Sequence, residues 1–306
     1  MKKTALFLIF ILTCAFISAE SGYYRRADFL LMNSSAQAAG LSGAVIARQA
    51  GTGVMTYNPA GLFGTKTFDI SLSYSINGMN GLNGTYTMAS MPTQYGAFGA
   101  AYMFNREDYN SAQVVNKMVL ACYSFQPFDY FSAGINLKYA ASSRLSESAG
   151  FLAADIGVIY SLDDALALGL TLANAGFEMT SAGIYSYYAK MAVPAEIKAG
   201  IDYKAVNDNM NSLTADALLG FGIFGSTIDI SGGLEYVYLK QFFIRAGAAT
   251  ARLEDSASYD SYLSAGLGMN YELNGANFKL EYSYLPKIAG NGGFGESQVI
   301  SISGSF

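Results

Sequence analysis

Apolar and polar residues alternate along most of this sequence, in segments of about ten residues. Between Phe131 and Tyr139 (FSAGINLKY) the apolar residues occupy the odd positions, and between Phe278 and Tyr284 (FKLEYSY) they occupy the even ones. A period of two over this length indicates a β-strand with one apolar and one polar face. A chain that repeats the pattern so often is predicted to form a transmembrane β-barrel, whose apolar outer face contacts lipid.

Fourteen segments fit this pattern, and an even number is what a bacterial barrel requires. The predicted fold class is therefore all-β, an antiparallel transmembrane β-barrel of about 14 strands within residues 66–306. The weakest alternation is at 84–91 and 212–221. The predicted strands are 66–75, 84–91, 95–104, 113–125, 130–141, 150–161, 165–174, 194–205, 212–221, 227–239, 241–251, 260–272, 276–285 and 297–306.

The predicted connections alternate between tight ones, such as 92–94 and 274–275, and long ones, such as 105–112 and 175–193. Outer-membrane barrels have short periplasmic turns and longer external loops, so both termini are expected to be periplasmic. A soluble β-sandwich would also alternate, but it would not need so many strands with an apolar, lipid-like face.

The N-terminus predicts the compartment. Lys2 and Lys3 precede the apolar run 5–12, and small residues follow, so residues 1–19 are expected to be a cleaved secretory signal. Cys14 leaves a lipoprotein signal as an alternative, although the Thr before it fits that pattern poorly. With the barrel pattern, the signal predicts the outer membrane of a two-membrane bacterium, with outer-membrane lipid as a partner.

Composition excludes several classes of protein. The chain has no His, so it cannot assemble a Ser-His-Asp triad, a Cys-His pair or a His-ligated metal site. Lys and Arg total 18 against 23 Asp and Glu, so no basic surface is available for nucleic acid. We therefore expect a non-enzymatic protein without a metal or cofactor.

The last residue, Phe306, ends an alternating segment in which Ile300 and Ile302 share its parity. An aromatic C-terminus on a terminal strand is similar to the signal by which outer-membrane barrels are delivered to the barrel assembly machinery. We expect Phe306 to be that signal.

Residues 20–65 do not alternate, and small residues dominate their centre. Irregular backbone cannot lie exposed in hydrocarbon, because its polar groups would be unsatisfied. We therefore expect a partly helical plug segment inside the barrel that controls passage. Two motifs occur in it, AAGLSGA and NPAGL, and the residues that define them are Gly40, Gly43, Asn58, Pro59, Ala60 and Gly61.

The NPAGL motif allows two interpretations. Asn58-Pro59 favours the start of a turn, since Pro fixes its own φ and restricts the residue before it, and Gly61 permits a tight return. The motif is then a turn between plug and barrel. The alternative is that it contacts a ligand.

The two motifs together resemble the N-terminal signature of the FadL/PorV-type outer-membrane proteins, most closely the PorV/PorQ group. The resemblance implies a 14-stranded barrel with an N-terminal plug. Through PorV relatives it implies a part in type IX secretion or surface assembly, with secretion components as partners. The alternative, through FadL relatives, is transport of hydrophobic molecules such as long-chain fatty acids. Ser42 departs from the usual Gly, and Arg48-Gln49 stands where an acidic pair is common.

Ionisable residues at the parity that faces the lumen carry nearly balanced charge, which favours paired contacts between wall and plug over an ion filter. The residues expected to face the lumen are Lys117, Lys138, Asp155, Lys198, Asp202, Asp229, Glu235, Arg245 and Glu281.

Overall fold

A computed structural model describes residues 27–49, 51–77, 82–109, 112–145, 147–182, 193–223, 227–252, 259–289 and 297–306. The predicted signal, residues 1–19, lies outside these ranges. Within them, no helix has the length and apolar character needed to cross a membrane.

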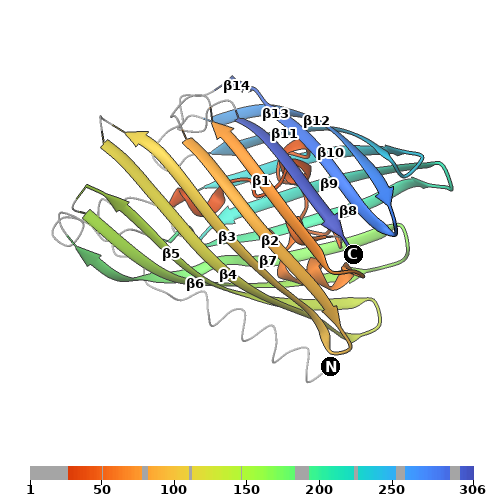
Figure 1. The fold of residues 1–306 in the computed structure, drawn as a ribbon, viewed down its shortest axis with the longest axis horizontal. Helices are drawn as coiled ribbons and strands as arrows, with labels where there is room; N and C mark the ends of the chain where they lie inside the picture. The colour runs from red at the N-terminus through yellow and green to blue at the C-terminus, as the bar shows by residue number, and fades with distance from the viewer. Residues whose placement is uncertain are drawn as a thin grey trace.

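The strands form one closed antiparallel barrel (Figure 1). Neighbours in the chain pair with one another, and β1 pairs with β15 to close the ring. Fourteen strands make the wall, because the fifteenth, β14, has only three residues and pairs beside β12. This confirms the predicted fold class. The strands are β1 Asp69–Asn77, β2 Leu82–Thr93, β3 Gly96–Tyr109, β4 Ala112–Phe128, β5 Phe131–Arg144, β6 Glu147–Ser161, β7 Leu166–Ala182, β8 Glu196–Asn207, β9 Asn211–Gly222, β10 Ile228–Tyr238, β11 Phe242–Arg252, β12 Tyr259–Leu273, β13 Ala276–Leu285, β14 Lys287–Ala289 and β15 Ser297–Ser305.

The predicted tight connections are tight in the structure. Asn274 and Gly275 join β12 to β13 with φ of 53° and 83°, the positive values that a two-residue hairpin turn requires. We call this end of the barrel the tight-turn end and the other the long-connection end.

Some predicted long connections were wrong. Most of 105–112 is strand, because β3 continues to Tyr109 and β4 begins at Ala112, and most of 142–149 is strand in the same way. The ladder continues there although the alternation has faded. Strand residues beyond the hydrocarbon no longer need an apolar outer face, so the sequence pattern ends before the hydrogen bonds do.

Side chains on the two faces of the wall differ as predicted. Leu137 is 57% exposed on the outside, whereas its neighbours Asn136 and Lys138 are buried inside. Ile201 and Leu280 are also exposed. The described surface therefore has an apolar outer face, and the buried residues of the chain lie in the lumen.

At the tight-turn end the C-terminus is joined to the start of the wall. Phe306 and Phe68 exchange two backbone hydrogen bonds, of 2.9 and 3.2 Å. The ring of Phe306 packs edge-on against Phe278, 6.0 Å between centroids, and is exposed on the outer face.

The described part of the N-terminal segment, residues 27–65, lies inside the barrel and is called the plug (Figure 1, red to orange). It contains the 3-10 helices η1 (Asp28–Leu31), η2 (Thr52–Val54) and η3 (Pro59–Gly64) and the α-helix α2 (Ala36–Gly40). Helix α2 contacts β11–β13 and β15, and η3 contacts β3–β6, so the plug reaches both halves of the wall.

A charge placed in the hydrocarbon of the membrane tests the assignment of the outer face. Leu137→Arg places a cation at the middle of the lipid-facing surface, and we expect it to lower the free energy of unfolding by about 2–4 kcal/mol. Leu273→Arg, also outward but at the last residue of β12, should cost about 1 kcal/mol or less because it lies near the interface. Denaturant titration in lipid vesicles measures both. Equal costs would contradict the assignment.

Candidate functional site

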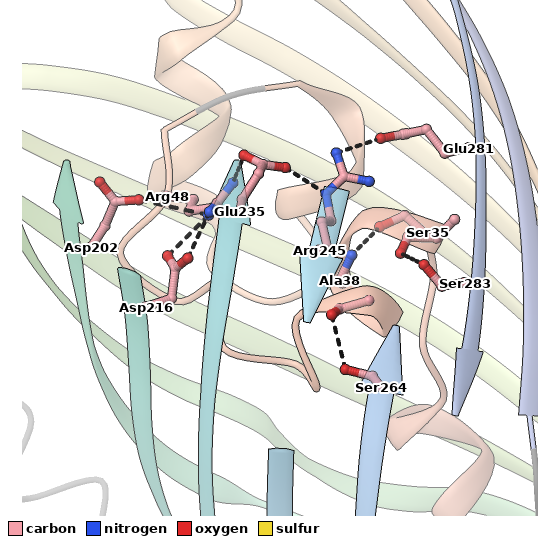
Figure 2. A network of polar contacts seen from close by, with 12 residues as sticks. Ser35, Ala38, Arg48, Asp202, Asp216, Glu235, Arg245, Ser264, Glu281 and Ser283 are labelled. Atoms are coloured by element: carbon pink, nitrogen blue, oxygen red, sulfur yellow. Dashed lines mark hydrogen bonds and ion pairs between the residues drawn. The ribbon is translucent and has the colours of Figure 1, made fainter. Parts of the chain in front are cut away.

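Helix α2 is held by hydroxyl groups of the wall. The backbone N–H of Ala36 donates to Ser301 Oγ at 2.8 Å, and Ser283 Oγ donates to the Ala36 carbonyl at 2.6 Å. Ser35 caps the helix by accepting a hydrogen bond from the N–H of Ala38 (Figure 2). The wall thus satisfies polar groups that a short buried helix would leave without partners.

Both glycines of the first motif have a structural reason. A Cβ on Gly40 would lie 2.7 Å from Ser283 Oγ, so only Gly allows α2 to approach the wall this closely. Gly43 has φ of 81°, a conformation that favours Gly, in the turn that ends α2. Ser42, the departure from the family pattern, hydrogen-bonds Ser264 of β12 through its hydroxyl at 2.8 Å.

Asn58 organises the second motif. It is fully buried, and its Oδ1 accepts the N–H of Ala60 at 3.0 Å, which caps η3. Its Nδ2 donates to the carbonyls of Ile46 at 2.7 Å and Val158 at 3.2 Å, so it joins two parts of the plug and β6. Each polar atom of this side chain is used within the protein, which favours the turn interpretation over ligand contact.

The NPAGL motif packs directly against glycines of the wall. A Cβ on Gly134 of β5 would lie 2.5 Å from the carbonyl carbon of Pro59, and one on Gly157 of β6 would overlap Asn58. Gly61 faces the Arg48 carbonyl at a distance that also excludes a Cβ. Helix η3 therefore lies directly on the wall backbone.

Tyr57 joins the beginning and the end of the plug. Its hydroxyl donates to Asn33 Oδ1 at 2.9 Å and accepts the N–H of Ser34 at 3.3 Å. Ser34 and Thr56 also share a hydroxyl hydrogen bond of 2.7 Å. Burial raises the pKa of Tyr57 to about 12, so the phenol stays neutral and remains a donor.

Arg48 connects the plug to the wall through ion pairs with carboxylate side chains (Figure 2). Its guanidinium makes two hydrogen bonds to Asp216 of β9, at 2.9 and 2.6 Å, and one to Glu235 of β10 at 2.6 Å. Asp202 of β8 lies 3.6 Å away. Burial alone would lower the pKa of Arg48, but Glu235 and Asp216 outweigh it and raise that pKa, so Arg48 is charged.

Arg245 of β11 extends this network. It donates to Glu235 through Nε and lies 2.7 Å from Glu281 of β13 through Nη2 (Figure 2). Asp216, Arg48, Glu235, Arg245 and Glu281 thus form a chain of alternating charge along the inner face of β9–β13. Removing one member of such a buried chain leaves its partners uncompensated, which costs far more than an exposed pair contributes.

A second ion pair joins β5 and β6. Lys138 Nζ lies 2.7 Å from Asp155 and donates to Asn174 Oδ1 of β7 at 2.7 Å. Asn136 donates to Asp155 at 2.7 Å and to the carbonyl of Met55 at 2.8 Å, so this cluster also holds the plug.

Eight of the nine residues expected to face the lumen are on the inner face, and Lys117 is the exception. Lys117 is exposed and shares the outer parity of β4 with Val119, whereas Met118 and Leu120 point inward. The prediction failed because it took the polar residue for the inner one. This part of the lumen is apolar, so both faces of β4 are largely apolar there and alternation does not distinguish them.

Two residues of the network, Arg48 and Asp216, are not among those predicted to face the lumen. Arg48 was noted only as a departure from the family pattern, and Asp216 was overlooked because alternation is weak over 212–221. A cation in a plug that faces a largely acidic wall is a signal that could have identified Arg48.

An apolar cluster fills the opposite part of the lumen. Phe29 of η1 and Phe151 of β6 have ring centroids 6.3 Å apart, and methionines from wall and plug surround them. We name this group the methionine cluster. Its principal members are Met88, Met103, Met118, Leu120 and Phe151 of the wall and Phe29, Leu30, Met32, Met55 and Leu62 of the plug.

No protein-family model matches the chain, and no characterised protein matches it by sequence. Solved structures do. The CymD monoaromatic hydrocarbon channel has a TM-score of 0.67 at 13% identity, over 90% of this chain and 98% of its own. A FadL homologue from Pseudomonas aeruginosa gives 0.62 at 12% identity, over 89% and 98%. The toluene transporter TodX from Pseudomonas putida gives 0.61 at 12% identity, over 93% and 99%.

These likenesses establish the fold class. The chain has the architecture of the FadL-type barrels, a 14-stranded wall around an N-terminal plug.

Loss of the Arg48 charge should release the plug. Arg48→Met leaves Asp216 without its cation and Glu235 with Arg245 alone, a change that costs about 3–5 kcal/mol in buried pairs, and we expect the ionic conductance of the barrel to rise. Planar-bilayer recording measures it. Lys66→Met removes an exposed cation and should leave the conductance unchanged. A closed Arg48→Met barrel would show that these ions do not hold the plug.

Steric displacement of η3 should also raise the conductance, because it moves the plug away from the wall. Gly134→Ala forces a Cβ against Pro59, so we expect a loss of about 1–3 kcal/mol in stability and a more frequently open channel. Gly232→Ala is the matched control, because its Cβ would meet only the Asp216 carbonyl at 3.5 Å, an ordinary contact. If Gly134→Ala and Gly232→Ala gave the same conductance in bilayer recordings, the close approach of η3 to the wall would be contradicted.

Proposed function

We propose that this protein is an outer-membrane channel through which small hydrophobic molecules pass. The fold supports the proposal, since the solved structures that it resembles are described as hydrocarbon channels, a toluene transporter and a FadL homologue. Those descriptions belong to proteins of 12–13% identity, so the support for passage of hydrophobic molecules comes from the residues that line this lumen.

The methionine cluster is the observation that carries the proposal. The interior of a water-filled barrel is polar, yet here Met88, Met103, Met118, Leu120 and Phe151 point inward from four strands. Apolar plug residues cover them, so this wall is not wet in the closed barrel. An apolar solute that replaced the plug residues would gain about 25 cal/mol for each Å² it buries. Methionine adapts its shape to different apolar partners.

The secretion role that the PorV/PorQ resemblance implies has less support. Its motif residues are used inside the barrel, where Asn58 caps η3 and Gly40 packs against the wall, so they offer no surface to a secretion component. The solved structures also favour transport over secretion.

Two further expectations stay part of the proposal. The exposed apolar belt of the wall would contact outer-membrane lipid, and Phe306, exposed at the end of β15, would be available to the barrel assembly machinery. The protein would not be an enzyme, because its solved structural relatives are channels and the sequence has no His for a nucleophile–base pair.

Uptake of a hydrophobic dye tests the proposal. Cells that produce the chain should take up N-phenyl-1-naphthylamine faster than cells without it, while entry of a small polar solute stays the same. Met103→Gln keeps the side-chain size but makes the methionine cluster polar, and we expect it to lower the dye rate about fivefold, an energy near 1 kcal/mol.

Met91→Gln is the matched control, because Met91 lies on β2 but is 50% exposed on the outer face, and its dye rate should equal that of the unmodified protein. Dye uptake that does not depend on the chain, in cells where the barrel is assembled, would contradict transport and leave the secretion role as the better hypothesis.

A further inference from the structure

A row of polar residues crosses four neighbouring strands in the other part of the lumen. Thr171 of β7 pairs with Lys198 of β8, Lys198 with Gly220 of β9, and Gly220 with Asp229 of β10. We name these four residues the polar row. Gly220 lets the side chains on either side of it come close, since a Cβ there would lie 3.3 Å from Asp229 and 3.4 Å from Lys198.

The polar row retains unused hydrogen-bonding capacity within the described protein. Oδ1 of Asp229 and Oγ1 of Thr171 are buried and have no hydrogen-bond partner, and Thr171 is 0% exposed. Ser231, next along the inner face of β10, has a buried hydroxyl in the same condition. Buried polar atoms are rarely left in this state, because each costs about 1–3 kcal/mol. Asp229 and Ser231 lie two residues apart on the same face of β10, so their two unpartnered oxygens indicate a place where a donor from outside the chain binds, whereas Thr171 lies three strands away on β7.

Carboxylates outnumber cations around the polar row. Glu196 forms an ion pair with Lys198 at 2.7 Å, so the charge of that lysine is already matched. Asp229 adds a second carboxylate, so among these described residues two carboxylates face one lysine. An incoming anion would meet an excess of negative charge at this site.

The other buried cations of the described lumen are also engaged. Arg48 and Arg245 bind Asp216, Glu235 and Glu281, and Lys138 binds Asp155. Lys279 lies 4.9 Å from the centre of the Phe243 ring. A carboxylate head group that entered here would have to displace an internal partner of one of these cations.

We propose that the polar row binds the head group of an amphiphile that donates hydrogen bonds, with an ammonium group preferred over a carboxylate. This rests on the proposed function, in which hydrophobic molecules pass through the lumen. The head group donates to Asp229 Oδ1 and to the hydroxyl of Ser231, and its positive charge balances the excess carboxylate. A fatty-acid anion has no proton to donate, and its charge is repelled.

Three ligands with the same eight-carbon chain test this preference at pH 8: octylammonium, octanol and octanoate. The protein in nanodiscs of zwitterionic lipid is loaded with N-phenyl-1-naphthylamine, and displacement of the dye is measured after subtraction of empty nanodiscs. We expect octylammonium to compete about tenfold better than octanoate, with octanol between them, as one partly buried charge contact would give.

Asp229→Asn should reduce the difference between octylammonium and octanoate to about twofold or less, since it removes the charge and keeps the size. Asp69→Asn is the matched control, because Asp69 is also buried on the inner face but begins β1, far from β10 in the strand order. It should retain the tenfold difference. Heat-modifiable migration of both variants on gels verifies that they are folded.

Each other outcome has a distinct meaning. Octanoate that competes as well as octylammonium, or better, overturns this inference and leaves hydrophobic transport intact. Octylammonium preference that Asp229→Asn does not change overturns the assignment to the polar row. Failure of the dye and of all three ligands to bind overturns the proposed function itself.

Discussion

The structure depends on one constraint, that every backbone N–H and C=O group inside hydrocarbon needs a hydrogen-bond partner within the protein. Fourteen strands meet it because β1 pairs with β15 and leaves no edge. The same constraint places residues 27–65 inside, since 3-10 turns and a five-residue helix satisfy too few of their own groups to face lipid. Wall side chains such as Ser283 and Ser301 supply what those turns lack.

Closure of the wall then determines how the plug can be held. Three kinds of contact hold it: close packing of η3 on bare wall backbone at Gly134, hydrogen bonds from wall hydroxyls to α2, and ion pairs from Arg48 to strands β9 and β10. Packing at Gly134 tolerates no added atom, whereas the ion pairs depend on matched charge and hydrogen-bond geometry. The β3–β6 side therefore fixes the position of the plug, and the β8–β13 side retains it by electrostatics.

Sequence alone predicted the barrel, most strand positions and the plug, because alternation with period two reports directly which face meets lipid. It failed where the lumen itself is apolar. On β4 the inner residues are Met118 and Leu120, so Lys117 was assigned to the wrong face. It also could not pair Arg48 with Asp216, because that contact joins residues 168 positions apart and depends on which strand the plug crosses.

The failure at Lys117 and the proposed function have one physical origin. A lumen that only conducted water and ions would be polar all round, and the alternation rule would then hold on every strand. Here the rule fails at Lys117, where the methionine cluster makes the inner face apolar as well as the outer one, and it holds where the polar row lies, so the two sides of the lumen have different chemistry. A lumen with one apolar side and one polar side suits an amphiphilic solute, which has one apolar end and one end that donates hydrogen bonds. Asp229 and Ser231, which share one face of β10 and each have a buried oxygen without a partner within the described protein, are the groups that would bind the polar end of such a solute.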